Sequence, residues 1–118
     1  MIQRRQVLVA SVGAALVSGL QTAHAQSGKT VRIVVPFAPG GTSEIVARSV
    51  AAELTKSLGQ SVFVENKPGG AGTVAMMEAV KSVPDGHTLI LGHVGTLAVN
   101  PSLYPKLPYN PLKDFAPV

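Results

Sequence analysis

The most informative stretch of the chain lies at residues 31–43 and reads VRIVVPFAPGGTS. Its first half, residues 31–35, is mostly β-branched and predicts a buried strand. Pro36 ends that strand, and the prolines and paired glycines behind it can continue neither a strand nor a helix. Thr42 or Ser43 is then a suitable N-cap. The stretch therefore predicts a strand, a glycine-rich loop and the start of a helix.

The predicted helix continues to Gly59, a typical C-terminal cap. Its apolar residues recur at helical spacing and predict one face directed at the core. That face comprises Val46, Ala47, Val50, Ala51, Leu54 and Leu58.

The same order of elements then repeats along the chain. Residues 62–65 predict a second strand, residues 66–72 a second glycine-rich loop, and residues 73–83 a second helix. This helix is expected to turn Val74, Met77 and Val80 inward. After a predicted turn at residues 84–86, the sequence predicts a third strand at residues 88–91 and a third loop of small residues at 92–96.

Strands that alternate with helices indicate an α/β fold, with a parallel sheet and flanking helices. The proline-punctuated tail predicts a surface excursion, with one short helix near residues 102–104. Residues 114–118 resemble the lead-in to a further strand. Three parallel strands leave a sheet edge without a partner. We therefore expect the sequence to be the front part of a longer protein.

The composition excludes several classes of protein. The 118 residues suffice for one small domain, and they contain no cysteine, which excludes a disulfide framework and a thiolate metal site. Tryptophan is absent and aromatic residues make up 4%, so a base-stacking platform is not expected. Of the ten Lys and Arg residues, two lie at Arg4 and Arg5, and the others are scattered without a basic stripe. We therefore expect no nucleic-acid partner.

Residues 1–25 are predicted to be a secretory signal peptide. Arg4 and Arg5 precede an uncharged run at residues 7–20, and Ala23-His24-Ala25 is a typical cleavage site. The run is shorter than the roughly 20 residues of a membrane span. It also lacks the polar face that an amphipathic first helix would need. We expect cleavage after Ala25, leaving residues 26–118 in the periplasm, by either the general or the twin-arginine export route.

In an open parallel sheet, ligands bind beyond the carboxyl ends of the strands. Here that edge carries the three glycine-rich loops, and two of them lead into helix N-termini, where backbone N–H groups and the helix dipole favour an anion. The glycines could instead serve only as tight turns, but three such loops at one edge favour a binding site. Gly41 in particular is expected to adopt a positive φ and to leave room for a ligand. Neither the P-loop motif nor the dinucleotide-binding motif fits these loops.

The polar residues near this edge predict no catalytic set and no metal site. Glu44 could complement the helix dipole or meet a ligand ammonium, and the first role is favoured. Lys67 is interpreted as a solvated loop lysine rather than a partner of a ligand anion. Among the histidines only His93 lies near the edge, and a lone histidine is more often an ordinary polar residue than a ligand. No nucleophile, base and orienting acid can be assembled, and no cofactor is predicted.

The mature sequence resembles the Bug-type receptors, the extracytoplasmic substrate-binding proteins of tripartite tricarboxylate transporters. The resemblance rests on five segments in the family's order: VVPFAPGGTS with the following Ala-Arg, VENKPGGAG, PDGHTL, LPYNP and DFAPV. Two positions depart from the usual pattern, because Glu44 replaces an aspartate and His87 a tyrosine.

This resemblance implies the first of two α/β lobes that close on a small carboxylated solute, a di- or tricarboxylate or an amino acid. The receptor would deliver the solute to membrane transporter subunits and would not be an enzyme. The loop after the first strand would help to hold the ligand carboxylate, and with Glu44 it gives the candidate site Phe37, Ala38, Pro39, Gly40, Gly41, Thr42, Ser43 and Glu44. The alternative is a small exported α/β enzyme that acts on an anionic or phosphorylated substrate at the same edge.

Overall fold

A computed structural model describes residues 28–118 of the chain. The segment expected to be a signal peptide, with its cleavage site after Ala25, lies outside the described residues. None of the helices between residues 28 and 118 combines the length and the apolar character that crossing a bilayer requires.

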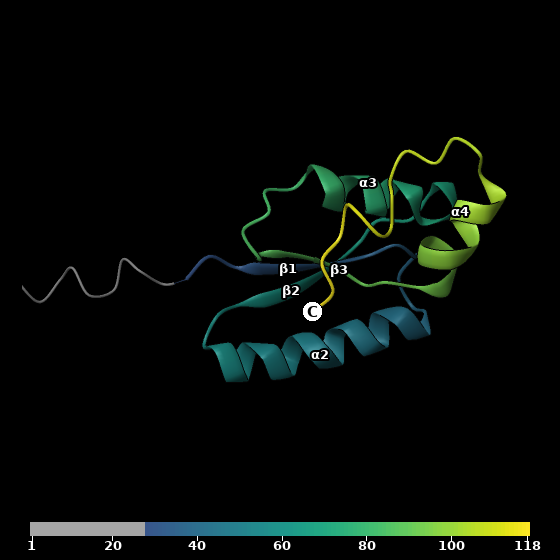
Figure 1. Ribbon diagram of the computed structural model, residues 1–118. Helices are drawn as coiled ribbons and strands as arrows, with labels where there is room; N and C mark the ends of the chain where they lie inside the picture. The colour runs from purple at the N-terminus through teal and green to yellow at the C-terminus, as the bar shows by residue number, and fades with distance from the viewer. Residues whose placement is uncertain (1–27) are drawn as a thin grey trace, which may run out of the picture.

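The centre of the fold is a three-stranded parallel sheet in the order β2-β1-β3 (Figure 1). The strands are β1 (Val31–Val35), β2 (Val62–Asn66) and β3 (Thr88–Ile90). β1 is the middle strand, and all of its residues except Arg32 are buried, as a strand covered on both faces requires. The predicted parallel α/β architecture is confirmed, and the bounds of β2 and β3 each differ from the prediction by one residue.

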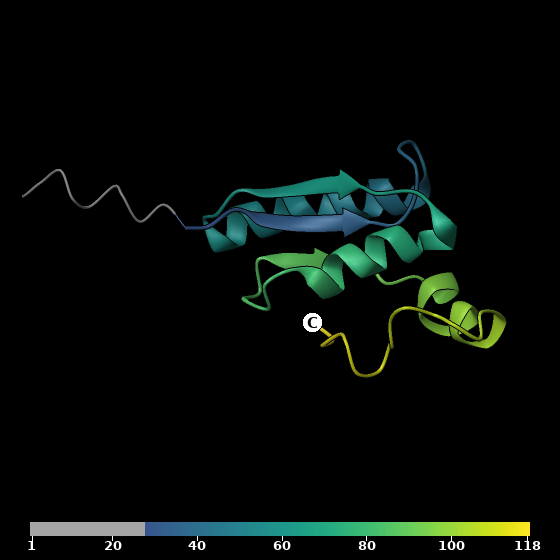
Figure 2. The ribbon, with the colours of Figure 1, turned by 90° about the horizontal axis from the view of Figure 1, so that it is seen from above.

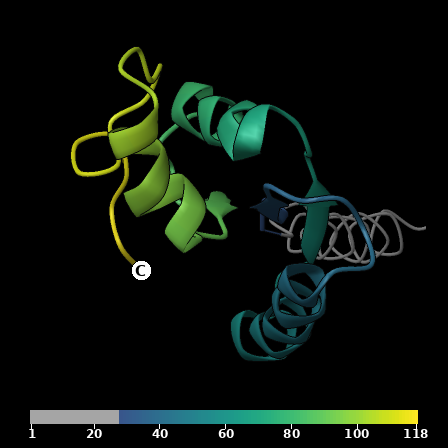
Figure 3. The ribbon, with the colours of Figure 1, turned by 90° about the vertical axis from the view of Figure 1, so that its right-hand side faces the viewer.

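Two helices cover opposite faces of the sheet (Figure 3). Helix α2 (Thr42–Leu58) packs against β1 and β2, whereas α3 (Thr73–Lys81) packs against β1 and β3. The core between α2 and the sheet is built from Ile33, Val35, Ala47 and Ala51, with six partly buried apolar side chains around them. The sheet is thus held between two layers of helix, and its carboxyl-terminal edge is left to the loops.

The predicted core faces of both helices are only partly correct. In α2, Ala47 and Ala51 are buried, but Val46 and Val50 are about half exposed, at 53% and 47%. In α3 the buried residues are Ala75 and Met76, while Val74 is half exposed. Alanines at the contact let a helix axis approach the sheet closely. The small residues of α2 therefore face the core and the larger valines lie on its flank.

The chain after β3 becomes helical earlier than expected. The π-helical turn η2 (Gly95–Val99) runs directly into α4 (Asn100–Leu103), so part of the predicted third loop and the start of the predicted tail are helical. α3 also ends at Lys81, two residues before the predicted bound. The tail that follows α4 has no further strand in the described residues, but it brings Tyr109 into a buried position.

Candidate functional site

The three loops that follow the strands lie together at the carboxyl-terminal edge of the sheet (Figure 2). They comprise residues 36–41 after β1, 67–72 after β2 and 91–94 after β3. Because all three strands run in the same direction, their carboxyl ends meet at one edge. We call this set of loops the rim, and its three segments the first, second and third loops.

Direct contacts join the loops of the rim to one another. The Asn66 side-chain amide donates a hydrogen bond of 3.0 Å to the Phe37 carbonyl, which ties the end of β2 to the first loop. The Phe37 ring meets the His93 ring edge-on, with 4.9 Å between centroids, and so links the first loop to the third. Sequence reasoning did not single out Asn66 as a site residue, although its position at the end of a strand could have pointed to this role.

Gly72 of the second loop packs closely against the start of the first loop and against η2. A Cβ built on Gly72 would collide with the Thr96 methyl group just beyond the third loop, and it would lie 3.3 Å from Pro36 Cβ in the first loop. Gly72 also has φ +86°, a left-handed conformation that side chains disfavour. The rim therefore requires glycine at this position for both space and backbone conformation.

The first loop delivers free backbone donors at the start of α2. The N-cap is Gly41, which offers no side-chain cap, so the expectation of Thr42 or Ser43 in this role is wrong. Within the described residues, the N–H groups of Gly41, Thr42 and Ser43 donate no hydrogen bond. Three donors at the positive end of a seventeen-residue helix suit a carboxylate.

The backbone conformation of the first loop differs from the expectation at Gly41. Gly41 is extended, with φ −88° and ψ 167°, and the left-handed residue is its neighbour Gly40, with φ +94°. A Cβ on Gly41 would meet nothing closer than the Ala38 carbonyl oxygen, at 4.0 Å. The fold therefore tolerates a side chain at Gly41, and a substitution there changes only the open space in front of the α2 N-terminus.

The Glu44 side chain folds back onto the first loop. One carboxylate oxygen accepts the Gly40 N–H at 2.5 Å, and the other accepts Arg48 at 2.6–2.7 Å. The Gly40 N–H, and next the Arg48 guanidinium, hold the pKa of the Glu44 carboxyl below its ordinary value. Both oxygens are thus engaged by the chain itself, which favours a structural role for Glu44 over contact with a ligand ammonium.

Lys67 belongs to a charged cluster and is not simply solvated, as the sequence had suggested. Its ammonium lies 3.0 Å from Glu65 and 3.4 Å from Glu78, and both carboxylates also contact Arg32, at 2.9 and 2.6 Å. The Glu65 carboxylate, followed by Glu78, raises the pKa of the Lys67 amine. Two cations and two anions balance within this cluster, so it leaves no net charge for a ligand.

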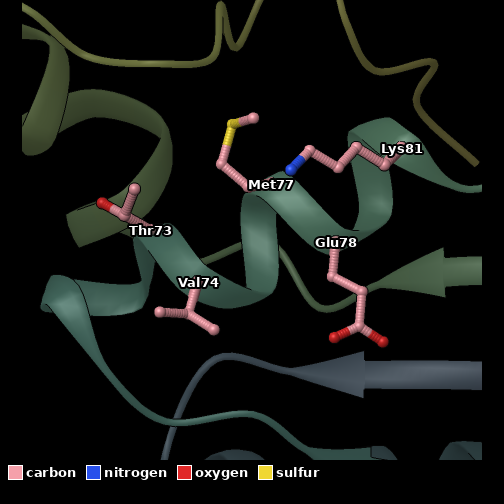
Figure 4. A pocket seen from close by; sticks show the side chains of 5 residues that line it. All are labelled: Thr73, Val74, Met77, Glu78 and Lys81. Atoms are coloured by element: carbon pink, nitrogen blue, oxygen red, sulfur yellow. The ribbon is translucent and has the colours of Figure 1, made fainter.

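An open groove of about 480 Å³ runs along α3 beside this charged cluster. Figure 4 shows Glu78 pointing from α3 toward the strands, whereas Met77 points away from them. The groove is lined by Thr73, Val74, Met77, Glu78 and Lys81, all from α3. No residue of the first or third loop contributes to its lining, so it is separate from the candidate site.

His93 serves the start of the helical segment that follows the third loop. Its Nδ1 accepts the Gly95 N–H at 3.0 Å, so the neutral ring carries its proton on Nε2. Among residues 28–118 no three metal-ligating side chains lie close enough to hold an ion. The other candidate residues, from Phe37 to Ser43, form one continuous segment in which Ala38 to Thr42 are exposed.

The sequence and the fold agree with those of one receptor family. The family described as tripartite tricarboxylate transporter family receptor matches residues 46–118. Protein BugT of Bordetella pertussis is 40% identical over 82% of this chain and 30% of its own length. The chain spans about a third of the length of the curated relatives it matches.

Two solved structures share both fold and sequence with the chain. MatC from Rhodopseudomonas palustris, solved with bound malate, is 52% identical with a TM-score of 0.72, over 75% of this chain and 30% of that one. A second R. palustris protein, solved with adipate, is 40% identical with a TM-score of 0.72 over the same shares. The chain belongs to the receptor family of the tripartite tricarboxylate transporters.

Proposed function

We propose that the chain forms the first lobe of an extracytoplasmic receptor that binds a small carboxylated solute at the rim. The observation that carries the proposal is the set of free N–H groups of Gly41, Thr42 and Ser43 at the start of α2. Hydrogen bonds from such donors to a carboxylate contribute roughly 1.5–3 kcal/mol each. The ligands of two related structures, malate and adipate, are both dicarboxylates, which supports the same class here.

The receptor acts by binding and delivery, without catalysis. Its second lobe would close over the solute, and membrane subunits of the transporter would receive it. Residues 1–25 would direct export and be removed after Ala25, so that the protein works in the periplasm. N-terminal sequencing of the exported protein should therefore begin at Gln26, and an intact Met1 on the exported product would contradict the leader assignment.

Titration calorimetry of the protein expressed from its own reading frame tests the function directly. The probes are malate, adipate, citrate and aspartate, which sample dicarboxylates, a tricarboxylate and an amino acid. We expect one-to-one binding of at least one probe without turnover. Turnover of an anionic or phosphorylated compound would instead support the exported-enzyme alternative, and no binding to any probe would contradict the proposed ligand class.

Two substitutions locate the site. Gly41→Val fills the space in front of the free donors but meets no close atom in the fold, so binding should fall at least tenfold while stability changes little. Thr42→Val removes one exposed hydroxyl, a loss on the order of 1–3 kcal/mol if that group contacts the ligand. Thr30→Val is the matched control, because it makes the same change before β1, at the opposite end of the strand. Unchanged affinity in both rim variants would place the ligand elsewhere.

A further inference from the structure

Three polar side chains are buried beneath the second loop, away from the proposed ligand donors. Thr96 is 1% exposed, and Asn100 and Tyr109 are each 4% exposed. Buried polar groups destabilise a fold unless they are hydrogen-bonded, so a cluster of this kind has a specific geometry. The proposed binding of a carboxylate at the first loop does not use any of the three.

The hydrogen bonds of this cluster form one connected chain, in which Asn100 donates to both of its neighbours. The Asn100 side-chain amide donates to the Ala71 carbonyl at 2.9 Å and to the Tyr109 hydroxyl at 3.2 Å. The Tyr109 hydroxyl in turn donates to the Thr96 carbonyl at 2.6 Å. Both amide protons and the hydroxyl proton are therefore used, and the chain runs from the tail through α4 to the second loop.

The segment held by this chain has an unfavourable backbone conformation. Gly70, Ala71 and Gly72 are left-handed in succession, with φ of 56°, 53° and 86°, and Ala71 is the one non-glycine residue with positive φ in the described chain. An L-residue with a Cβ disfavours this conformation, so Ala71 needs an outside contact to keep it. The Asn100 hydrogen bond to the Ala71 carbonyl supplies that contact.

The left-handed turn sets the geometry of the rim. It ends at Gly72, the N-cap of α3, whose missing side chain makes room for the Thr96 methyl group and for Pro36. Pro36 begins the first loop. A change in the turn would therefore shift both the start of α3 and the position of the first loop.

We infer that Asn100 and Tyr109 are positioning residues for ligand binding, and this inference rests on the proposed function. Their hydrogen bonds hold the second loop in its left-handed turn. Because Gly72 at the end of this turn packs against Pro36, they also fix the position of the first loop and of the free N–H groups that follow it. The tail, expected from the sequence to be a surface excursion, thus serves the binding site by bringing Tyr109 under the rim.

Tyr109→Phe is the direct test, because it removes only the hydroxyl and keeps the ring beside Phe115, whose centroid lies 6.2 Å away. The N–H groups of Gly72 and Thr73 donate to the Gly69 and Gly70 carbonyls within the turn. Exchange of these two amide protons, measured by NMR without ligand, should become roughly tenfold faster, as expected when one buried hydrogen bond is lost. Affinity for whichever of malate, adipate, citrate or aspartate the parent binds should fall by a similar factor. Tyr104→Phe, at an exposed tyrosine in the same segment, should change neither quantity.

Two further variants separate positioning from general stability. Ala71→Gly in the Tyr109→Phe background should restore part of the affinity, because glycine takes the left-handed conformation without support. Ala51→Gly weakens α2 on the far side of the sheet, and it should lower the melting temperature without lowering affinity at 25 °C. Loss of affinity in Ala51→Gly as large as in Tyr109→Phe, or failure of Ala71→Gly to restore any, would overturn the inference.

The two proposals fail in different measurements. If the parent protein binds none of the four probes, the proposed function is contradicted, while amide exchange still reports on the turn. If exchange at Gly72 and Thr73 in Tyr109→Phe equals that of the parent, the hydroxyl does not hold the second loop and the inference is overturned, whatever the ligand.

Discussion

The first and second loops of the rim are held in opposite ways. The first loop is exposed from Ala38 to Gly41, and two side chains from outside it hold it: Glu44 accepts the Gly40 N–H, and Asn66 donates to the Phe37 carbonyl. The second loop is fixed from below by Asn100, and its Gly72 is buried against Thr96 and Pro36. The first loop leads into three free donors at the start of α2, and the second loop is an internal support.

This difference shows where the protein can accept change. At Gly41 a side chain would extend into open space, whereas at Gly72 it would meet packed atoms. A ligand site needs hydrogen-bond donors that are free to bind and a rigid structure that holds them in place. In the rim, the first loop leads to the free donors and the second loop supplies the rigid support. Substitutions in the first loop should therefore change binding with little effect on stability. Substitutions in the second loop should change stability, and they should change binding only through the position of the first loop.

The largest effect is expected from Gly72→Ala. The added methyl group collides with Thr96, and the left-handed backbone disfavours alanine, so the free energy of unfolding should fall by about 2–4 kcal/mol. Urea unfolding measures this change. Gly41→Ala is the matched control, with an expected change within about 0.5 kcal/mol. Equal losses in the two variants would remove the distinction between the loops.

A smaller effect is expected where the two loops are tied together. Asn66→Ala removes the amide that donates to the Phe37 carbonyl at 3.0 Å, so unfolding should become easier by about 1 kcal/mol. Affinity for the carboxylate probes should also fall, because Phe37 begins the candidate site. Asn110→Ala, in the exposed turn of the tail, offers a comparison in which affinity should not change. Unchanged affinity in Asn66→Ala would mean that the first loop keeps its place without the tie.

The sequence predicted the parts of this molecule that depend on local patterns. The β-branched run at Val31–Val35 and the left-handed cap at Gly59 specify their own conformations, and both lie where they were expected. The core-facing sides of α2 and α3 were assigned with less success. In α2 the valines and the alanines lie in adjacent stripes with the same helical spacing, so the spacing alone does not show which stripe faces the sheet. The close approach of the helix to the sheet places Ala47 and Ala51 in the core.

The candidate site shows the same limit. The three loops could be placed at one edge from strand order alone, since parallel strands end together. The free donors of the first loop and the buried chain from Tyr109 to Ala71 depend on contacts between residues up to 29 positions apart in the sequence. No local pattern specifies such contacts, so the support of the second loop was not predicted.

The role of Glu44 can be tested by comparing two glutamates of α2. Glu44→Gln replaces the charged acceptor of the Gly40 N–H, so it should lower the urea midpoint more than Glu53→Gln, whose carboxylate makes an exposed pair with Lys56. The preference among malate, adipate, citrate and aspartate should stay the same, because both Glu44 oxygens face the chain itself. A shift in preference away from aspartate in Glu44→Gln would give this side chain a direct role at a ligand ammonium.

The smallest effect is expected at the opposite edge of the sheet, in the turn before β3. Asp85 pairs with Lys29 at 2.9 Å, and this ammonium, followed by the His87 N–H, lowers the pKa of its carboxyl to about 2. A carboxyl whose pKa is lower in the folded state stabilises the fold above its unfolded pKa, near 4, and loses that contribution as the pH falls toward 2. Urea midpoints measured from pH 6 to pH 2 should therefore fall less steeply in Asp85→Asn than in the parent. Because the pair is exposed, the difference at pH 6 should be small, and affinity for the carboxylate probes at the rim should not change. Parallel pH profiles in the two proteins would show that this ion pair contributes nothing to stability.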